Sequence, residues 1–236
     1  TRQHTAQEAS DWIRNNVPKG SLILKEHWEE GLPNLHEYQS DELPMYDEDS
    51  VAKIGKISNL LSKADYIVLY SQRLYATLPR LKERYPISSN YYELLFSNKL
   101  GYDLVNFQTS YPSILGVTFI DETFGRSGLT TPTILTQFKP STFNINMGVA
   151  DESFTVYDHP KVLIFRNIDK FSSTEIENSL LYDTKDLINA RKAGLMLSEK
   201  EALLQQSGGT WNEIIDLSSW TNRFPVVAWL LLIQGI

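Results

Sequence analysis

The segment Asp65-Tyr66-Ile67-Val68-Leu69-Tyr70-Ser71 constrains the fold of this chain more than any other segment. Its apolar residues follow one another without alternation, which is typical of a strand that is covered on both faces. A mainly parallel sheet with helices on both sides gives such cover. The chain has 236 residues, of which 42% are apolar, so it is long enough to bury a core of this kind. We predict an α/β domain with a small, mainly parallel sheet and flanking helices, in which this strand is central.

The segments before this strand fit an alternation of helices and strands. Thr5 and Glu8 have the spacing of a capping box, and the helix that they begin should end before Pro18. A short apolar strand is expected over residues 21–24. The next helix should begin after Ser50, a residue type that caps helices well.

The second half of the domain is expected to end in a β-hairpin. Residues 121–150 are low in charge and rich in Thr, Pro, Gly and Asn, which predicts a long loop insertion. The runs Phe154-Thr155-Val156-Tyr157 and Val162-Leu163-Ile164-Phe165 flank a four-residue turn, which is the pattern of a C-terminal hairpin.

Beyond residue 168 the strand patterns stop and helical patterns follow, the first over residues 173–181. We therefore predict an α/β domain over residues 1–168, followed by a helical segment over residues 169–236.

Composition excludes several classes of function. The chain has 22 Lys and Arg against 29 Asp and Glu, and its net charge of −7 argues against nucleic acid as a partner. It has no Cys, which excludes disulfides, thiolate metal sites and Cys nucleophiles. Phosphate-binding and dinucleotide-binding glycine motifs are absent, and no two of the four His have metal-ligand spacing. The sequence therefore implies no metal and no cofactor.

Two groups of residues are candidates for ligand binding. The first is Glu26-His27-Trp28-Glu29-Glu30, which follows the strand over residues 21–24. Ligands of open α/β sheets bind at the carboxyl ends of strands, where a Trp could stack on a sugar and acids could accept its hydroxyl hydrogen bonds. The second is the pair Asp158 and His159, in which the acid could orient the imidazole. The candidate ligand-binding residues are His27, Trp28, Glu29, Glu30, Asp158 and His159.

Both groups also have a plainer structural interpretation. Residues 26–49 hold nine acidic side chains and no Lys or Arg, and such a run, interrupted by Pro33 and Pro44, is typical of an irregular solvated loop. Asp158 and His159 precede Pro160, and Asp and Pro are favoured in tight turns for backbone reasons.

The last segment carries an apolar run without a charge over residues 225–236. A membrane-spanning helix needs about 20 such residues. We expect this run to be the start of a span in a longer protein and to lie near the lipid bilayer over residues 220–236; a buried C-terminal helix is the alternative.

Several blocks of this sequence resemble a known family. They are residues 11–21, 26–29, 64–71, 79–86, 91–97 and 152–162. Together they are similar to the soluble extracytoplasmic region of bacterial polytopic membrane glycosyltransferases of the protein-mannosyltransferase (family 39, GT-C) type. Residues 208–231 resemble the lead-in to a second membrane module, of the YYY type, that is joined to such regions.

The resemblance implies transfer of a sugar from a polyprenyl-phosphate donor to an acceptor on the extracytoplasmic side of a membrane. In these enzymes the catalytic Asp lies in a loop that precedes this region, so no catalytic residue is carried over to this chain. The chain would then be an accessory domain, with the membrane portion of its parent protein and a sugar or glycan acceptor as partners.

Two other functions stay open at this stage. One is a stand-alone hydrolase acting on carbohydrate, with Glu29 or Glu30 working alongside Asp158 and His159, provided that these groups meet in one pocket. The other is an assembly module without a ligand, bound through Trp220, Phe224 and Trp229.

Overall fold

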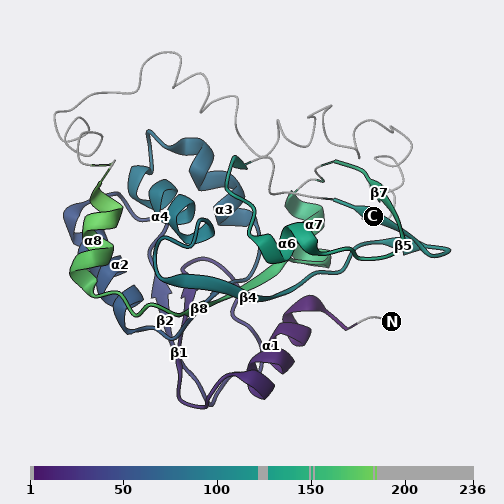
Figure 1. The fold of residues 1–236 in the computed structure, drawn as a ribbon, viewed down its shortest axis with the longest axis horizontal. Helices are drawn as coiled ribbons and strands as arrows, with labels where there is room; N and C mark the ends of the chain where they lie inside the picture. The colour runs from purple at the N-terminus through teal and green to yellow at the C-terminus, as the bar shows by residue number, and fades with distance from the viewer. Residues whose placement is uncertain (1–2, 122–126, 149, 151, 183, 185–236) are drawn as a thin grey trace, which may run out of the picture.

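A computed structural model describes residues 3–121, 127–148, 150, 152–182 and 184 of the chain (Figure 1). Its main sheet, sheet A, has five strands in the spatial order β2-β1-β3-β8-β4. The strands are β1 (Leu22–Glu26), β2 (Gln39–Leu43), β3 (Tyr66–Leu69), β4 (Tyr102–Gln108) and β8 (Val162–Asn167). Strand β1 pairs in parallel with β2 and β3, whereas β8 runs antiparallel to both β3 and β4.

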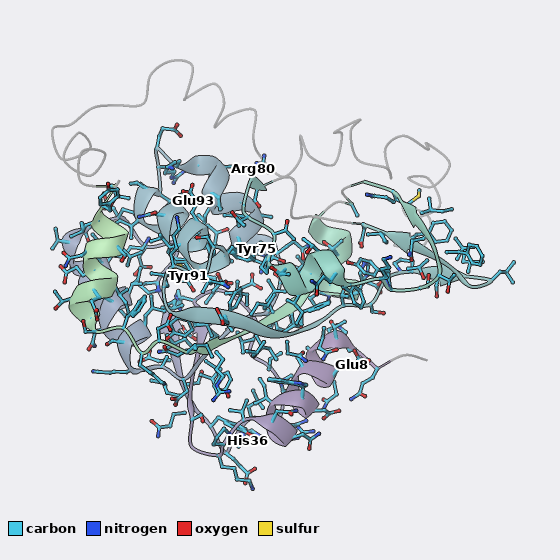
Figure 2. All side chains as sticks on the ribbon, in the orientation of Figure 1. Glu8, His36, Tyr75, Arg80, Tyr91 and Glu93 are labelled. Atoms are coloured by element: carbon cyan, nitrogen blue, oxygen red, sulfur yellow. The ribbon has the colours of Figure 1, made fainter. Side chains whose placement is uncertain are left out.

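Helices cover both faces of sheet A. The helix α1 (Thr5–Asn16) lies on one face, and Figure 1 shows the other helices of this domain on the opposite face. These are α2 (Val51–Lys63), α3 (Arg73–Thr77), the 3-10 helix η1 (Leu78–Leu81), α4 (Pro86–Phe96) and α8 (Ser173–Leu181). In Figure 2, Tyr75 and Tyr91 lie within this helical layer, and Glu8 lies on α1 across the sheet.

The strand β3 shows why the sheet needs cover on both faces. Tyr66 and Val68 pack under α1, whereas Ile67 and Leu69 join the larger core beneath α2 and α4. All four residues of the strand are buried. Because successive side chains of a strand point to opposite faces, a continuous apolar run fills both cores at once.

A second, smaller sheet projects from the domain. Sheet B consists of β5 (Ser113–Ile114), β6 (Val117–Ile120) and β7 (Phe143–Asn146), and Figure 1 shows it extending away from the helical layer. The short helices α6 (Thr133–Gln137) and α7 (Glu152–Asp158) lie between sheet B and sheet A.

The predicted fold class, α/β with a small and mainly parallel sheet and flanking helices, is confirmed. The central position of β3, the cap of α2 and the extent of α8 agree with the prediction as well. Ser50 caps α2 by accepting a hydrogen bond from the Lys53 amide, and α8 covers the residues predicted to be helical, 173–181.

The predicted C-terminal hairpin needs correction. Residues 152–158 form the helix α7, and β8 finds its antiparallel partners in β3 and β4 instead. The β-branched residues Thr155 and Val156 favour a strand locally, but both edges of β8 are already paired, so no position beside it is left for a hairpin partner.

Three smaller features also differ from the sequence expectations. The acidic segment 26–49 is not wholly irregular, because it contains the edge strand β2. The segment 121–150 contains α6 and β7 as well as loop. Finally, His4 rather than Thr5 caps α1, and the Thr5 hydroxyl donates instead to the carbonyl of Pro160 at 2.7 Å.

The core continues past the predicted boundary at residue 168. Ile176 and Leu180 of α8 are buried in the larger core with α2 and α4. Within the part of the chain that the structure describes, every helix is too short or too polar to span a membrane. The apolar run over residues 225–236 and Trp220, Phe224 and Trp229 lie outside the described residues.

Candidate functional site

The candidate site lies along the edge of sheet A where β1, β3 and β4 end. Because β8 runs antiparallel to its neighbours, it begins at this same edge. The residues that follow β1, β3 and β4 therefore meet the residues that precede β8. This is the edge at which open α/β sheets bind their ligands.

Glu26, the last residue of β1, is buried on the α4 side of the sheet. The Tyr92 hydroxyl donates a hydrogen bond to its Oε1, and no described residue pairs with its Oε2. Burial raises the pKa of Glu26 to about 8, and the nearby charge of Glu29 acts in the same direction against the Tyr92 hydrogen bond. The carboxyl group is therefore mainly protonated at neutral pH.

Glu29 connects the end of β1 to the segment after β3. Its Oε2 accepts a hydrogen bond of 2.8 Å from Ser71, and its Oε1 lies 3.3 Å from Nη1 of Arg73. Burial raises the pKa of Glu29, although the Ser71 hydrogen bond and the Arg73 charge oppose that rise. Arg73 in turn donates from Nη2 to the Tyr157 hydroxyl at 3.2 Å, so these contacts lead from β1 to the last turn of α7.

His159 is held between two carboxylates. Its Nε2 lies 2.8 Å from Oδ2 of Asp121, and its Nδ1 lies 2.9 Å from Oδ2 of Asp158. A neutral imidazole has one N–H and can donate to only one of them, whereas an imidazolium donates to two ionised carboxylates at once. Burial lowers the pKa of His159, but the hydrogen bonds and charges of Asp121 and Asp158 outweigh it and leave the pKa raised.

A pocket of about 360 Å³ opens beside this histidine. It is lined by Gln3, His4, Thr5, Ser110, Tyr111, Pro112, Ser113, Asp158 and His159. A neighbouring pocket of about 240 Å³ shares Ser110 and Tyr111 with it and continues toward sheet B. Neither lining includes a Lys or Arg, and hydroxyl groups are the commonest polar groups in both. We call the larger of the two the His159 pocket.

The residues predicted from the sequence fall into two groups. Asp158 and His159 line the His159 pocket, and Glu29 approaches the same end of the sheet through Arg73 and Tyr157. His27 instead pairs with Glu42 of β2, on the far side of β1. Its neighbour Trp28 is 70% exposed and packs edge-on against the His27 ring.

Glu30, the remaining predicted residue, is exposed. Burial raises the pKa of Tyr70, and the charges of Glu30 and Glu29 act in the same direction.

Sequence reasoning missed the residues that complete the pocket. Asp121, which contacts His159 without lining the pocket, stands in the segment predicted as an insertion. His4 precedes α1 and the neighbours Ser110 and Tyr111 follow β4, so these two parts of the chain meet beside His159 only when sheet A forms. Their residue types carry no spacing signal that could have grouped them.

The described residues contain no cluster of three His, Asp or Glu side chains that could hold a metal ion. Comparisons with family models, with curated proteins and with solved structures gave no match for this chain.

Proposed function

We propose that this chain is an accessory, extracytoplasmic domain of a polytopic membrane glycosyltransferase and that it binds the glycan acceptor in the His159 pocket. The catalytic Asp of the enzyme would belong to the membrane portion of the parent protein, which would transfer the sugar from a polyprenyl-phosphate donor. The proposal combines the resemblance of about residues 8–168 to that family with the chemistry of the pocket.

The lining of the His159 pocket is the observation that carries the proposal. The lining includes the side-chain amide of Gln3, the hydroxyl groups of Ser110 and Ser113, and Tyr111. Such groups offer both hydrogen-bond donors and acceptors to the hydroxyl groups of a sugar. The volume of about 360 Å³ lies within the range of small-ligand sites.

Charge favours a neutral ligand over a phosphorylated one. The Asp158 side chain is 73% exposed at the pocket, where it could accept hydrogen bonds from sugar hydroxyls. The positive charge of His159 is already compensated by two carboxylates, and no Lys or Arg lines the pocket. Lys161, whose Nζ lies 5.7 Å from the centroid of the Tyr111 ring, adds a second cation nearby, so the two carboxylates face two cations and an anionic ligand would gain no net attraction.

The same arrangement supports binding rather than catalysis. A general base needs a free nitrogen lone pair, and both nitrogens of the His159 ring are occupied by carboxylates. Glu26 and Glu29 are buried and do not line the His159 pocket. A hydrolase that used Glu26 or Glu29 would need an opening through which the substrate could reach their carboxyl groups.

The test is glycan binding by the purified chain, measured by an array and then by calorimetry. Asp158→Asn should weaken binding at least tenfold, because a hydrogen bond to a charged group contributes about 1.5–3 kcal/mol. Asp169→Asn is the matched control, since Asp169 is an exposed acid beyond the other end of β8. Absence of glycan binding would overturn the proposal.

The same samples should be assayed for release of reducing sugar from the bound glycan. We expect none. Turnover that Asp158→Asn abolishes and Asp169→Asn preserves would instead support a carbohydrate hydrolase.

A further inference from the structure

Sheet B places its apolar side chains on the outside. The register aligns Ile114, Val117 and Phe143 in one row across the three strands, and Phe119 with Ile145 in the next row on the same face. Ile114, Phe143 and Ile145 are 65%, 68% and 47% exposed. The opposite face carries Thr118, which is buried. If sheet B served only to complete the domain core, its apolar face would be buried and its polar face would be exposed.

The two-residue turn between β5 and β6 forms the tip of this sheet. It adds a further apolar side chain, Leu115, at a backbone position that disfavours large side chains. Leu115 and Gly116 connect β5 to β6 with φ angles of +52° and +82°. Two-residue hairpin turns of this kind favour Asn, Asp or Gly, because a larger side chain is strained at positive φ. Leu115 is 99% exposed, so no contact within the described residues explains its presence.

The projecting sheet and its approaches are nearly free of charge. Residues 104–120 and 127–148 contain one charged side chain, Lys139, although charged residues make up 22% of the chain. The chain as a whole has a net charge of −7, so the absence of acids from these two stretches contrasts with the rest of the sequence. A surface of this composition can enter a lipid headgroup region without burying a carboxylate or being repelled by anionic lipids.

The exposed apolar surface is large enough for insertion into a bilayer. Ile114, Leu115, Phe143 and Ile145 together expose on the order of 500 Å². A bilayer requires no minimum contact area, because each apolar side chain that enters it contributes independently.

We propose that the apolar face and tip of sheet B, formed by Ile114, Leu115, Phe143 and Ile145, insert into the interfacial region of a lipid bilayer. This inference does not rest on glycan binding. Ser113 of β5 lines the His159 pocket, so an inserted sheet B would hold that pocket beside the membrane surface.

The first experiment labels the tip. Because the chain has no Cys, Leu115→Cys and Val51→Cys each give one attachment point for an environment-sensitive fluorophore. Val51 is an exposed apolar residue of α2, and it serves as the control. With vesicles of phosphatidylcholine and phosphatidylglycerol, we expect a blue shift for the label at position 115 and none at position 51. A label at 115 that remains in water while the protein sediments with vesicles would overturn the proposal.

The second experiment removes the apolar tip without disturbing the turn. Leu115→Asn places a residue that tolerates positive φ, so folding should be preserved or improved. We expect Leu115→Asn to reduce vesicle binding by the full chain at least fivefold, whereas Val51→Ser should leave it unchanged. The binding should depend little on salt concentration. Equal binding by Leu115→Asn and the unmodified chain, or no binding by either, would overturn the inference. So would light scattering that shows a dimer which Leu115→Asn dissociates, since the face would then join two copies.

Discussion

The His159 imidazole and the Asp121 carboxylate form a contact of 2.8 Å in which both side chains are almost fully buried. Asp121 follows β6 of the projecting sheet, and His159 precedes β8 of the main sheet. The pair therefore joins sheet B to the edge of sheet A beside the His159 pocket. Because the contact is buried and the imidazole is charged, it should matter both for stability and for its dependence on pH.

Asp121→Asn should destabilise the protein by about 2 kcal/mol at pH 6, since it replaces a charged hydrogen bond with a neutral one in a buried position. The native pKa of His159 is raised, so its stabilising contribution is fully present below the unfolded value of about 6.5. That contribution is lost as pH rises through the native pKa. Urea unfolding at a series of pH values should therefore show that the free energy of unfolding decreases less above pH 6.5 in the variant than in the unmodified protein. An unchanged pH profile would contradict the assignment of the charge to His159.

Glu26→Gln should remove a second, separate pH dependence. The pKa of Glu26 is raised to about 8, so the native state holds a proton that the unfolded state releases above about pH 4.5. Stability should thus fall by on the order of 3 kcal/mol from pH 5 to pH 8 in the unmodified protein. The variant, which is neutral throughout, should lose far less over that range. Glu83→Gln, at an exposed position, should follow the unmodified protein.

Lys53→Met should be among the most destabilising single changes. The buried Lys53 ammonium lies 2.6 Å from an Asp49 carboxylate oxygen and within 2.9 Å of the Ser88 hydroxyl and the carbonyls of Met45 and Asp47, which share its three N–H donors. Its loss leaves the Asp49 carboxylate buried without its cation, at a cost of about 3–5 kcal/mol. Guanidinium unfolding would measure this. Adding Asp49→Asn to Lys53→Met should recover part of the loss, and additive losses from the two changes would argue against the ion pair.

Leu180→Ala should show that α8 belongs to the domain. Leu180 is fully buried beside α2 and α4, and removing its side-chain atoms should cost about 2–5 kcal/mol. Leu181→Ala, at a partly buried position next to it, should cost less. If both variants unfold at the denaturant concentration of the unmodified protein, α8 contributes little to the core.

The sequence predicted the elements that have a strong local signal. The apolar run that became β3 is long and continuous enough to require two cores, and Ser50 has the residue type of a helix cap. By contrast, β2 has the sequence Gln39-Ser40-Asp41-Glu42-Leu43, which looks like loop because an edge strand exposes most of its side chains. Residues 154–157 look like a strand but lie in α7, because pairing over the whole sheet outweighs local preference.

The candidate site could be predicted only in part, for a related reason. Asp158 and His159 are adjacent in sequence, so their contact has a local signal. Glu29 could be placed at a strand end by its position after β1. The partners Asp121, Ser110 and Tyr111 meet them only through the pairing of β4 with β8 and the return of the chain through sheet B. His27 turned toward Glu42 because β2, which was not predicted, lies beside it.

The late position of β8 in the chain has a consequence for folding. Its register pairs Tyr66 with Arg166, so the middle of sheet A is completed by a segment synthesised about 100 residues after β3. At 5–20 residues per second, the hydrogen-bonding edge of β3 stays open on the order of ten seconds during translation. An open edge on a wholly apolar strand is a template for pairing with other chains. The nascent chain should thus depend on chaperones until β8 emerges, and its refolding in dilute solution should be slow, as expected for high contact order.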